Sequence, residues 1–472
     1  MSTSLVVGIF ALTVTVVALL VSFYPTLHFT CREKKFNIST FWIGSVLGPS
    51  LVLLFRIDTF QGLIKGLTSH PRTNPLETLL LFFSLAFLSI YLSQTRIFEY
   101  LSSQTFKKSG TNPKRFFIAT YILVSVVTLV TSNDIVILVI TPFIYHISAQ
   151  SGLNPVPFLI VQFFTANIWS ALFYIGNPTN LYVAAYFKLN FIEYAITMAP
   201  TVIFAGIFNG LLTYHVTKPL MVAPVLPVSS SNVTTNLVVS VNVLSNVKVD
   251  EDWKVDVVGV VIGGVHLVFA IILLALSPLL KVEMYKVTLI AAGSLLLCLF
   301  VRFVFTSFKF SAIYKSITGL PFALAPFLVS MFIMTRVMED NKVTEEITKV
   351  LEGLLKNIGG KYTESLNVFI YGLLSSFSAN LMNNIPMTVF FSSVINSQVV
   401  TSRASMYALA FGSNIGANIS PLGALAGIMW LSILSTHSFK LKFSDFVKYG
   451  IKVTLPVLFS SLVVMSVQFY FF

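Results

Sequence analysis

Hydrophobic residues occur along this chain in runs long enough to cross a membrane, separated by short polar segments. A helix needs about 20 apolar residues to span the hydrocarbon core of a bilayer. We therefore predict ten crossings in two sets of five. They fall at residues 5–24, 41–55, 75–93, 155–173 and 199–216, and at 255–279, 286–305, 318–337, 404–434 and 447–470.

A different element lies between the third and fourth crossing of each set, where two apolar arms meet at a polar tip. The arms cover residues 115–150 and 364–398, and the tips are Ser132-Asn133-Asp134 and Asn383-Asn384. Backbone groups freed at such a tip must be satisfied by protein or by a water-lined cavity, because lipid offers them no partner. We predict two re-entrant hairpins whose tips lie at the membrane midplane.

The fourth crossing of each set is itself interrupted by polar, glycine and proline residues. The interruptions are Gly176-Asn177-Pro178-Thr179-Asn180 and the run from Gly416 to Gly423. They predict broken helices over about 155–187 and 404–434. Broken helices at corresponding places in two halves are typical of the substrate site of a secondary transporter.

The two sets align at an offset of about 250 residues, which indicates an internal duplication. The first repeat is residues 1–216, the second is 255–472, and a linker loop rich in Val, Ser, Asn and Thr covers 217–254. Five crossings per repeat is an odd number, so the second copy faces the opposite way. The predicted fold is an all-α polytopic membrane protein of about ten transmembrane helices, two re-entrant hairpins and inverted-topology repeats. Charged segments at 94–110 and 340–360 are predicted to be helices lying in the membrane interface.

Composition agrees with a membrane protein. Hydrophobic residues make up 56% of the chain and charged residues 10%, whereas soluble domains carry about 25% charged residues. We assign the net charge of +12 to loops that face an anionic leaflet, and not to nucleic-acid binding. Cys31 and Cys298 have neither disulfide nor metal-site spacing, and no phosphate-binding glycine loop is present. We therefore expect a transporter without cofactor or metal, and not an enzyme.

The orientation follows from the basic loops. Short Lys- and Arg-rich loops stay cytoplasmic, which places the N-terminus outside. The glycosylation sequon at Asn232 would be used only in the opposite orientation.

Asp134 is an ionisable side chain inside an apolar hairpin. Such residues are costly and mark ion or proton pathways. The alternative is an N-cap for the helix that resumes at Ile135. Desolvation favours the neutral carboxyl, and a helix N-terminus favours the carboxylate. Asn384 stands at the matching place in the second repeat, so coupling to a proton or cation should be asymmetric.

Amides gather at the tips and breaks of both halves. Asparagine offers donors and acceptors, which suits a hydroxylated solute, or an anion held beside helix N-termini. The alternative is that these amides tie the broken helices together by satisfying freed backbone groups. The candidate substrate-binding residues are Asn133, Asn177, Thr179, Asn180, Asn383, Asn384, Asn414 and Asn418, with Asn167 in the same amide set.

At the two tips and the two breaks, the latter running on to Trp430, the chain resembles the ArsB-type arsenite permeases. These belong to an ion-transporter superfamily with NhaD-type sodium/proton antiporters and di- and tricarboxylate carriers. The resemblance implies a scaffold of outer helices, a transport region of hairpins and broken helices, and export of arsenite or antimonite by proton antiport. It also implies that Asn133, Asp134, Asn177, Asn383 and Asn384 form the site, with Asp134 as the coupling group.

Asn414 is a departure, because many arsenite permeases carry an acidic residue there. The alternatives are a sodium/proton or other ion antiporter in which Asp134 binds the cation, a transporter of silicic acid or anions, and a membrane subunit driven by an external ATPase. Dicarboxylate carriers have Ser-Asn-Thr at both tips, which this chain lacks. The expected partners are a small metalloid or ion, a coupling proton or sodium, and the lipid bilayer of the plasma membrane. A homodimer is left open.

Overall fold

The computed structural model describes residues 27–31, 34–38, 40–68, 74–109, 112–222, 254–306, 308–322, 324–358, 360–398, 402–437, 439 and 441–471, with Thr13. The predicted crossing at 5–24, most of the linker and Asn232 lie outside these residues. Within the described residues, six helices are long and apolar enough to cross a membrane. They are α4 (Pro75–Gln94), α6 (Pro113–Val130), α10 (Phe191–Val222), α11 (Val257–Leu280), α12 (Met284–Phe305) and α20 (Phe443–Phe471).

The remaining elements are shorter, and they include both predicted hairpins. In the first half they are the antiparallel strands β1 (Leu27–Cys31) and β2 (Lys34–Ile38), then α2 (Thr40–Leu54), α3 (Phe60–Thr68), α5 (Ile97–Ser109), α7 (Asn133–Gln150), α8 (Val156–Trp169), η1 (Tyr174–Gly176) and α9 (Pro178–Phe187). In the second half they are α13 (Phe310–Thr318), α14 (Leu324–Asp340), α15 (Val343–Ile358), η3 (Gly360–Tyr362), α16 (Thr363–Met382), α17 (Asn384–Asn396), α18 (Arg403–Ile415), η4 (Gly416–Asn418), η5 (Pro421–Gly423) and α19 (Leu425–Thr436).

The predicted arms and breaks are confirmed. Helices α6 and α7 meet at residues 131–132, and α16 and α17 meet at Asn383. The first broken helix is α8, η1 and α9, and the second is α18, η4, η5 and α19. Helices α5 and α15 occupy the two segments predicted for the interface. The same order of hairpin, broken helix and long final helix therefore occurs twice along the chain.

The predicted linker begins at residue 217, which is too early in the chain. Helix α10 runs through Pro219 to Val222, so residues 217–222 are helical. A proline inside a helix removes one backbone hydrogen bond, but neighbouring helices can hold such a helix together. The β-hairpin at 27–38 and the short helices α3 and α13 were not predicted from the apolar pattern.

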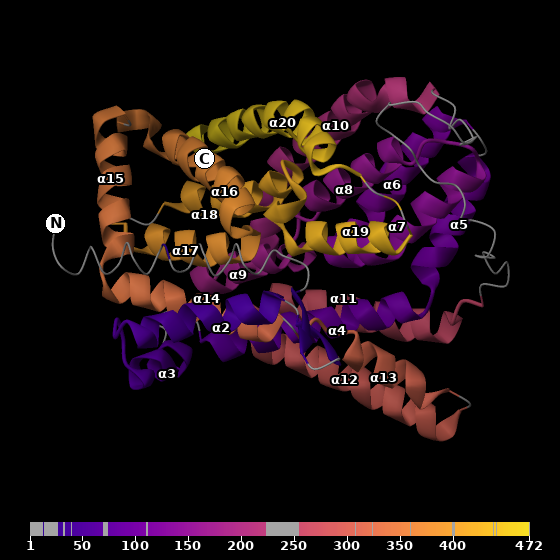
Figure 1. Ribbon diagram of the computed structural model, residues 1–472, viewed down its shortest axis with the longest axis horizontal. Helices are drawn as coiled ribbons and strands as arrows, with labels where there is room; N and C mark the ends of the chain where they lie inside the picture. Colours follow the sequence, from indigo (N-terminus) through magenta and orange to yellow (C-terminus); the bar gives the residue numbers. More distant parts are fainter. Residues whose placement is uncertain are drawn as a thin grey trace.

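The helices lie in layers (Figure 1). Helices α4, α11 and α12 run along the lower part of the view, and α10 and α20 lie side by side along the top. Between them lie α7, α9, α17 and α19, with the tips and breaks. Helices α16 and α18 pack closely through Gly412, where an added Cβ would lie 1.9 Å from Ser375 Oγ. Small residues at such contacts let helix backbones approach within a membrane.

Candidate functional site

The first hairpin tip is fastened to the first broken helix by Asn133. Its side chain is buried, and Nδ2 donates to Asn167 Oδ1 at 3.0 Å. Its Oδ1 accepts from the backbone N–H of Asp134 at 3.0 Å. Helix α7 therefore begins at Asn133, one residue earlier than the N-cap alternative for Asp134 assumed. Asp134 lies in the first helical turn, where the helix dipole favours negative charge.

The second tip is fastened to the second broken helix in the same way. Asn383 has a φ of 68° and a ψ of 152°, a backbone conformation that residues other than glycine rarely adopt. Its Oδ1 caps α17 by accepting from Ile385 N, and its Nδ2 donates to Leu422 O at 3.3 Å. One turn earlier, Asn380 Nδ2 donates to Gly416 O at 2.8 Å. At each tip, one backbone N–H of the helix that follows, Asp134 N or Ile385 N, therefore donates to the tip asparagine.

Buried amides also join the two broken helices across the halves of the chain. Asn167 Nδ2 donates to Asn418 Oδ1 at 2.9 Å, and Asn418 Nδ2 donates to Phe164 O at 3.2 Å. Asn133, Asn167 and Asn418 therefore form one continuous chain of hydrogen bonds that reaches from the first tip into the second half.

Asn414 is the centre of a second cross-connection. Its Oδ1 accepts from Asn177 Nδ2 at 2.9 Å and from Ser170 Oγ at 3.0 Å. Its Nδ2 donates to Asn180 Oδ1 at 2.5 Å. Ser413 Oγ, next in sequence, donates to Thr179 Oγ1 at 3.1 Å. Ser170 and Ser413 were not predicted, because single serines in apolar helices commonly bond to their own helix backbone.

Most predicted site amides therefore satisfy one another, as the alternative of tied broken helices expects. One buried acceptor does not: Asn384 Oδ1, at the start of α17, has no hydrogen-bond partner among the described residues. A buried polar atom without a partner is costly.

Asp134 lines a cavity of about 100 Å³ between α4, α7, α9 and α19. Ser132 and Asn177 line the same cavity, which brings the first tip and the first break together around the carboxyl group. Leu85, Leu181 and other apolar side chains form most of the wall. Asn177 thus belongs both to this cavity and to the Asn414 connection.

A duplicated order of hairpins and broken helices around a small cavity that holds Asp134 defines a secondary transporter of the ion-transporter superfamily, an integral multi-pass membrane protein and not an enzyme. The sequence model of the citrate transporter family matches residues 5–403. The chain belongs to this family.

Similar proteins agree with that assignment. The chain is 24% identical over 421 residues to a 46 kDa membrane protein of Mycobacterium leprae, covering 88% of this chain and 90% of that one. It is 25% identical over 407 residues to the arsenical pump membrane protein of Escherichia coli K12, covering 83% and 86%. The crystal structure of the Alcanivorax borkumensis YdaH transporter, described as having an unusual topology, matches with a TM-score of 0.54 at 15% identity, covering 99% and 98% of the two chains. That likeness concerns the fold alone.

Proposed function

We propose that this protein exports arsenite, antimonite or a similar small hydroxylated metalloid across the plasma membrane. Export is driven by proton antiport through alternating access, and Asp134 is the coupling group. The observation that carries the proposal is the cavity at the first tip, where Asp134, Ser132 and Asn177 meet. The similarity to arsenical pump membrane proteins supports this class of substrate.

The cavity favours a small neutral solute over a carboxylic acid. Its volume of about 100 Å³ has room for a few waters or a solute of that size. The described residues that line it include one carboxyl group, Asp134, and no Lys, Arg or His. A di- or tricarboxylate would meet a like charge there with no cation to balance it. A trihydroxy metalloid, neutral at pH 7, can donate to the carboxylate and accept from hydroxyl and amide groups.

Coupling follows if the solute and the proton use the same carboxyl group. A solute hydroxyl that donates to ionised Asp134 loses this acceptor when the group is protonated. Proton binding then weakens solute binding, and by linkage solute binding weakens proton binding by the same factor. We propose that Asn384, with its unpartnered Oδ1, and Asn383 contact the solute from the second tip. Asn133, Thr179, Asn180, Asn414 and Asn418 then hold the broken helices in register around it.

The second candidate is a sodium/proton or other cation antiporter. It is favoured by the oxygen ligands at the cavity, since a carboxylate, a hydroxyl and an amide oxygen are what hard cations prefer. In that case Asp134 binds the cation directly.

Uptake into everted vesicles separates these candidates. Arsenite, antimonite, silicic acid and sodium are each tested with an imposed pH gradient and without ATP, in the unaltered protein, Asp134→Asn and Asp445→Asn. Asp445 pairs with Lys448 at the surface and provides a matched control. We expect gradient-driven accumulation of arsenite in the unaltered protein and in the control. Asp134→Asn should permit only downhill equilibration.

Other results would reassign the function. Arsenite accumulation by Asp134→Asn that stays fully dependent on the gradient would contradict the coupling role. Exchange of sodium for protons without arsenite movement would favour the cation antiporter. Accumulation that requires ATP would favour a membrane subunit of an ATP-driven pump.

A further inference from the structure

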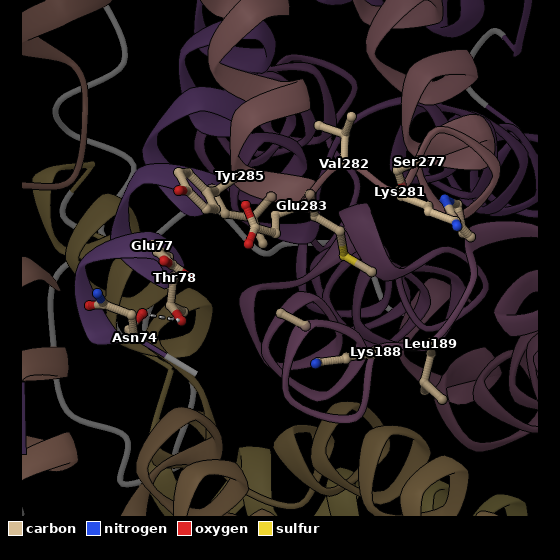
Figure 2. A pocket seen from close by; sticks show the side chains of 14 residues that line it. Asn74, Glu77, Thr78, Lys188, Leu189, Ser277, Lys281, Val282, Glu283 and Tyr285 are labelled. Atoms are coloured by element: carbon tan, nitrogen blue, oxygen red, sulfur yellow. Dashed lines mark hydrogen bonds between the residues drawn. The ribbon is translucent and has the colours of Figure 1, made fainter. Parts of the chain in front are cut away.

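A second cavity, of about 480 Å³, lies apart from the tips and breaks. It is enclosed by the first turns of α4, the end of α9 and the turn that joins α11 to α12 (Figure 2). Its lining shares no residue with the cavity around Asp134. The mechanism proposed above makes no use of it.

The cavity carries opposite charges on opposite sides. Figure 2 shows Glu77 and Glu283 toward the left of the opening and Lys188 and Lys281 toward the right. Among the described residues, neither Lys188 nor Lys281 forms an ion pair with an acidic side chain, whereas the charge of Glu77 interacts with that of Lys286. Glu283 pairs with Lys286 at 2.5 Å. The lining thus offers two lysines without an acidic partner and, across from them, two carboxylates that share the single charge of Lys286, a pattern that suits a ligand carrying both charges.

The depth of the cavity also limits its ligand. Helix α4 begins at Pro75, α11 ends at Leu280 and α12 begins at Met284, and all three are long and apolar enough to cross a membrane. Ends of transmembrane helices lie at the level of the lipid headgroups. Leu81 and Leu189 add apolar wall beside the charged groups. A ligand with a dipolar head and an apolar body fits such a place.

We propose that this cavity binds the headgroup of an aminophospholipid, such as phosphatidylethanolamine. Lys188 and Lys281 hold the phosphate, and Glu77 and Glu283 accept hydrogen bonds from the primary ammonium group. A purely anionic headgroup would satisfy the lysines but would face Glu77 with a like charge. A choline headgroup has no N–H to donate, whereas an ammonium group has three. The bound lipid connects α9 to α4, α11 and α12.

Lipid retention by the purified full-length chain tests the proposal without any transport assay. The protein in detergent is titrated with phosphatidylethanolamine, phosphatidylcholine and phosphatidylglycerol of identical acyl chains, and bound lipid is counted by native mass spectrometry. The variants are the pair Lys188→Ala and Lys281→Ala, the single Glu77→Gln, and a control pair, Lys309→Ala and Lys315→Ala. The control lysines lie on or beside α13, outside the cavity.

We expect phosphatidylethanolamine to bind about tenfold more tightly than the other two lipids. Replacing both Lys188 and Lys281 by alanine should abolish this binding. Glu77→Gln should lower the affinity for phosphatidylethanolamine to that for phosphatidylcholine. The control pair should change nothing. Because both cavity lysines are solvent-exposed, the double variant should fold. If it does not fold, the two single variants are tested in its place.

Three results would overturn the proposal. One is equal retention of all three lipids in every variant. Another is a preference for phosphatidylglycerol that survives Glu77→Gln, which would make the ligand an anionic lipid. The last is soluble phosphoethanolamine binding as tightly as the lipid, which would make the ligand a free phosphoamine. Failure of metalloid transport would leave these results unaffected, so the two proposals are tested separately.

Discussion

Replacing Asn414 by alanine should destabilise the protein by disconnecting the two broken helices. The truncation leaves Asn177 Nδ2 and Asn180 Oδ1 without their shared partner, while Ser170 Oγ keeps its hydrogen bond to Asn167 O. Each buried group left unpaired costs about 1–3 kcal/mol in soluble proteins, whereas side-chain hydrogen bonds between membrane helices average about 0.6 kcal/mol. For two such groups we expect a loss of about 1–4 kcal/mol in the free energy of unfolding.

The assay is unfolding of the purified protein by SDS in mixed micelles, followed by tryptophan fluorescence. Thr318→Ala is the control, since its hydroxyl is exposed and donates to Tyr314 O of its own helix. It should change the free energy of unfolding by less than about 0.5 kcal/mol. Asn414→Asp should also destabilise the protein, because its carboxylate still accepts from Asn177 and Ser170 but cannot donate to Asn180 Oδ1 and Ala410 O. If Asn414→Ala changed the free energy of unfolding no more than Thr318→Ala does, the hydrogen bonds of Asn414 would contribute nothing to stability.

Three further changes should have distinct outcomes. Asn384→Ala should weaken arsenite binding without changing the unfolding midpoint, because Asn384 Oδ1 has no hydrogen-bond partner among the described residues. Normal arsenite affinity in this variant would show that the amide is structural only. Gly412→Ala should lower the melting temperature, because the alanine Cβ would lie 1.9 Å from Ser375 Oγ and 2.5 Å from Gly372 O. An unchanged melting temperature would show that α16 and α18 can move apart freely. Arg302→Ala should lower the free energy of unfolding by about 1–3 kcal/mol, because it breaks two 2.7 Å hydrogen bonds to Asp256, which caps α11. A change near zero would mean that solvent fully screens this pair.

The helices and their breaks could be predicted because the apolar pattern has a physical cause that is local in sequence. Asn177-Pro178 starts a helix for the same reason in any protein, since the amide caps it and proline fits its first turn. The interruptions at Asn383 and Gly416 are equally visible as polar or glycine residues in apolar runs. The apolar run ends at residue 216, but α10 continues to Val222, because tertiary packing can carry a helix past a proline such as Pro219.

The partners of the amides could not be predicted, because sequence spacing does not report contacts between halves. Asn167 and Asn418 are 251 residues apart and yet hydrogen-bonded. The sequence left two interpretations of each amide open. The structure separates Asn414, whose side chain is hydrogen-bonded to several protein groups, from Asn384, whose Oδ1 has no partner in the part of the chain that the structure describes. The position of Asp134 beside Ser132 and Asn177 likewise required the fold.

Proton release on substrate binding tests the coupling role of Asp134 most directly. Arsenite is added to the purified protein in weakly buffered detergent solution, and a pH-sensitive dye reports the protons released per arsenite bound. The unaltered protein should release up to about one proton, near a pH where the carboxyl group is partly protonated, and Asp134→Asn should bind arsenite without release. Arsenite binding without proton release at any pH, or equal release by Asp134→Asn, would contradict Asp134 as the coupling group.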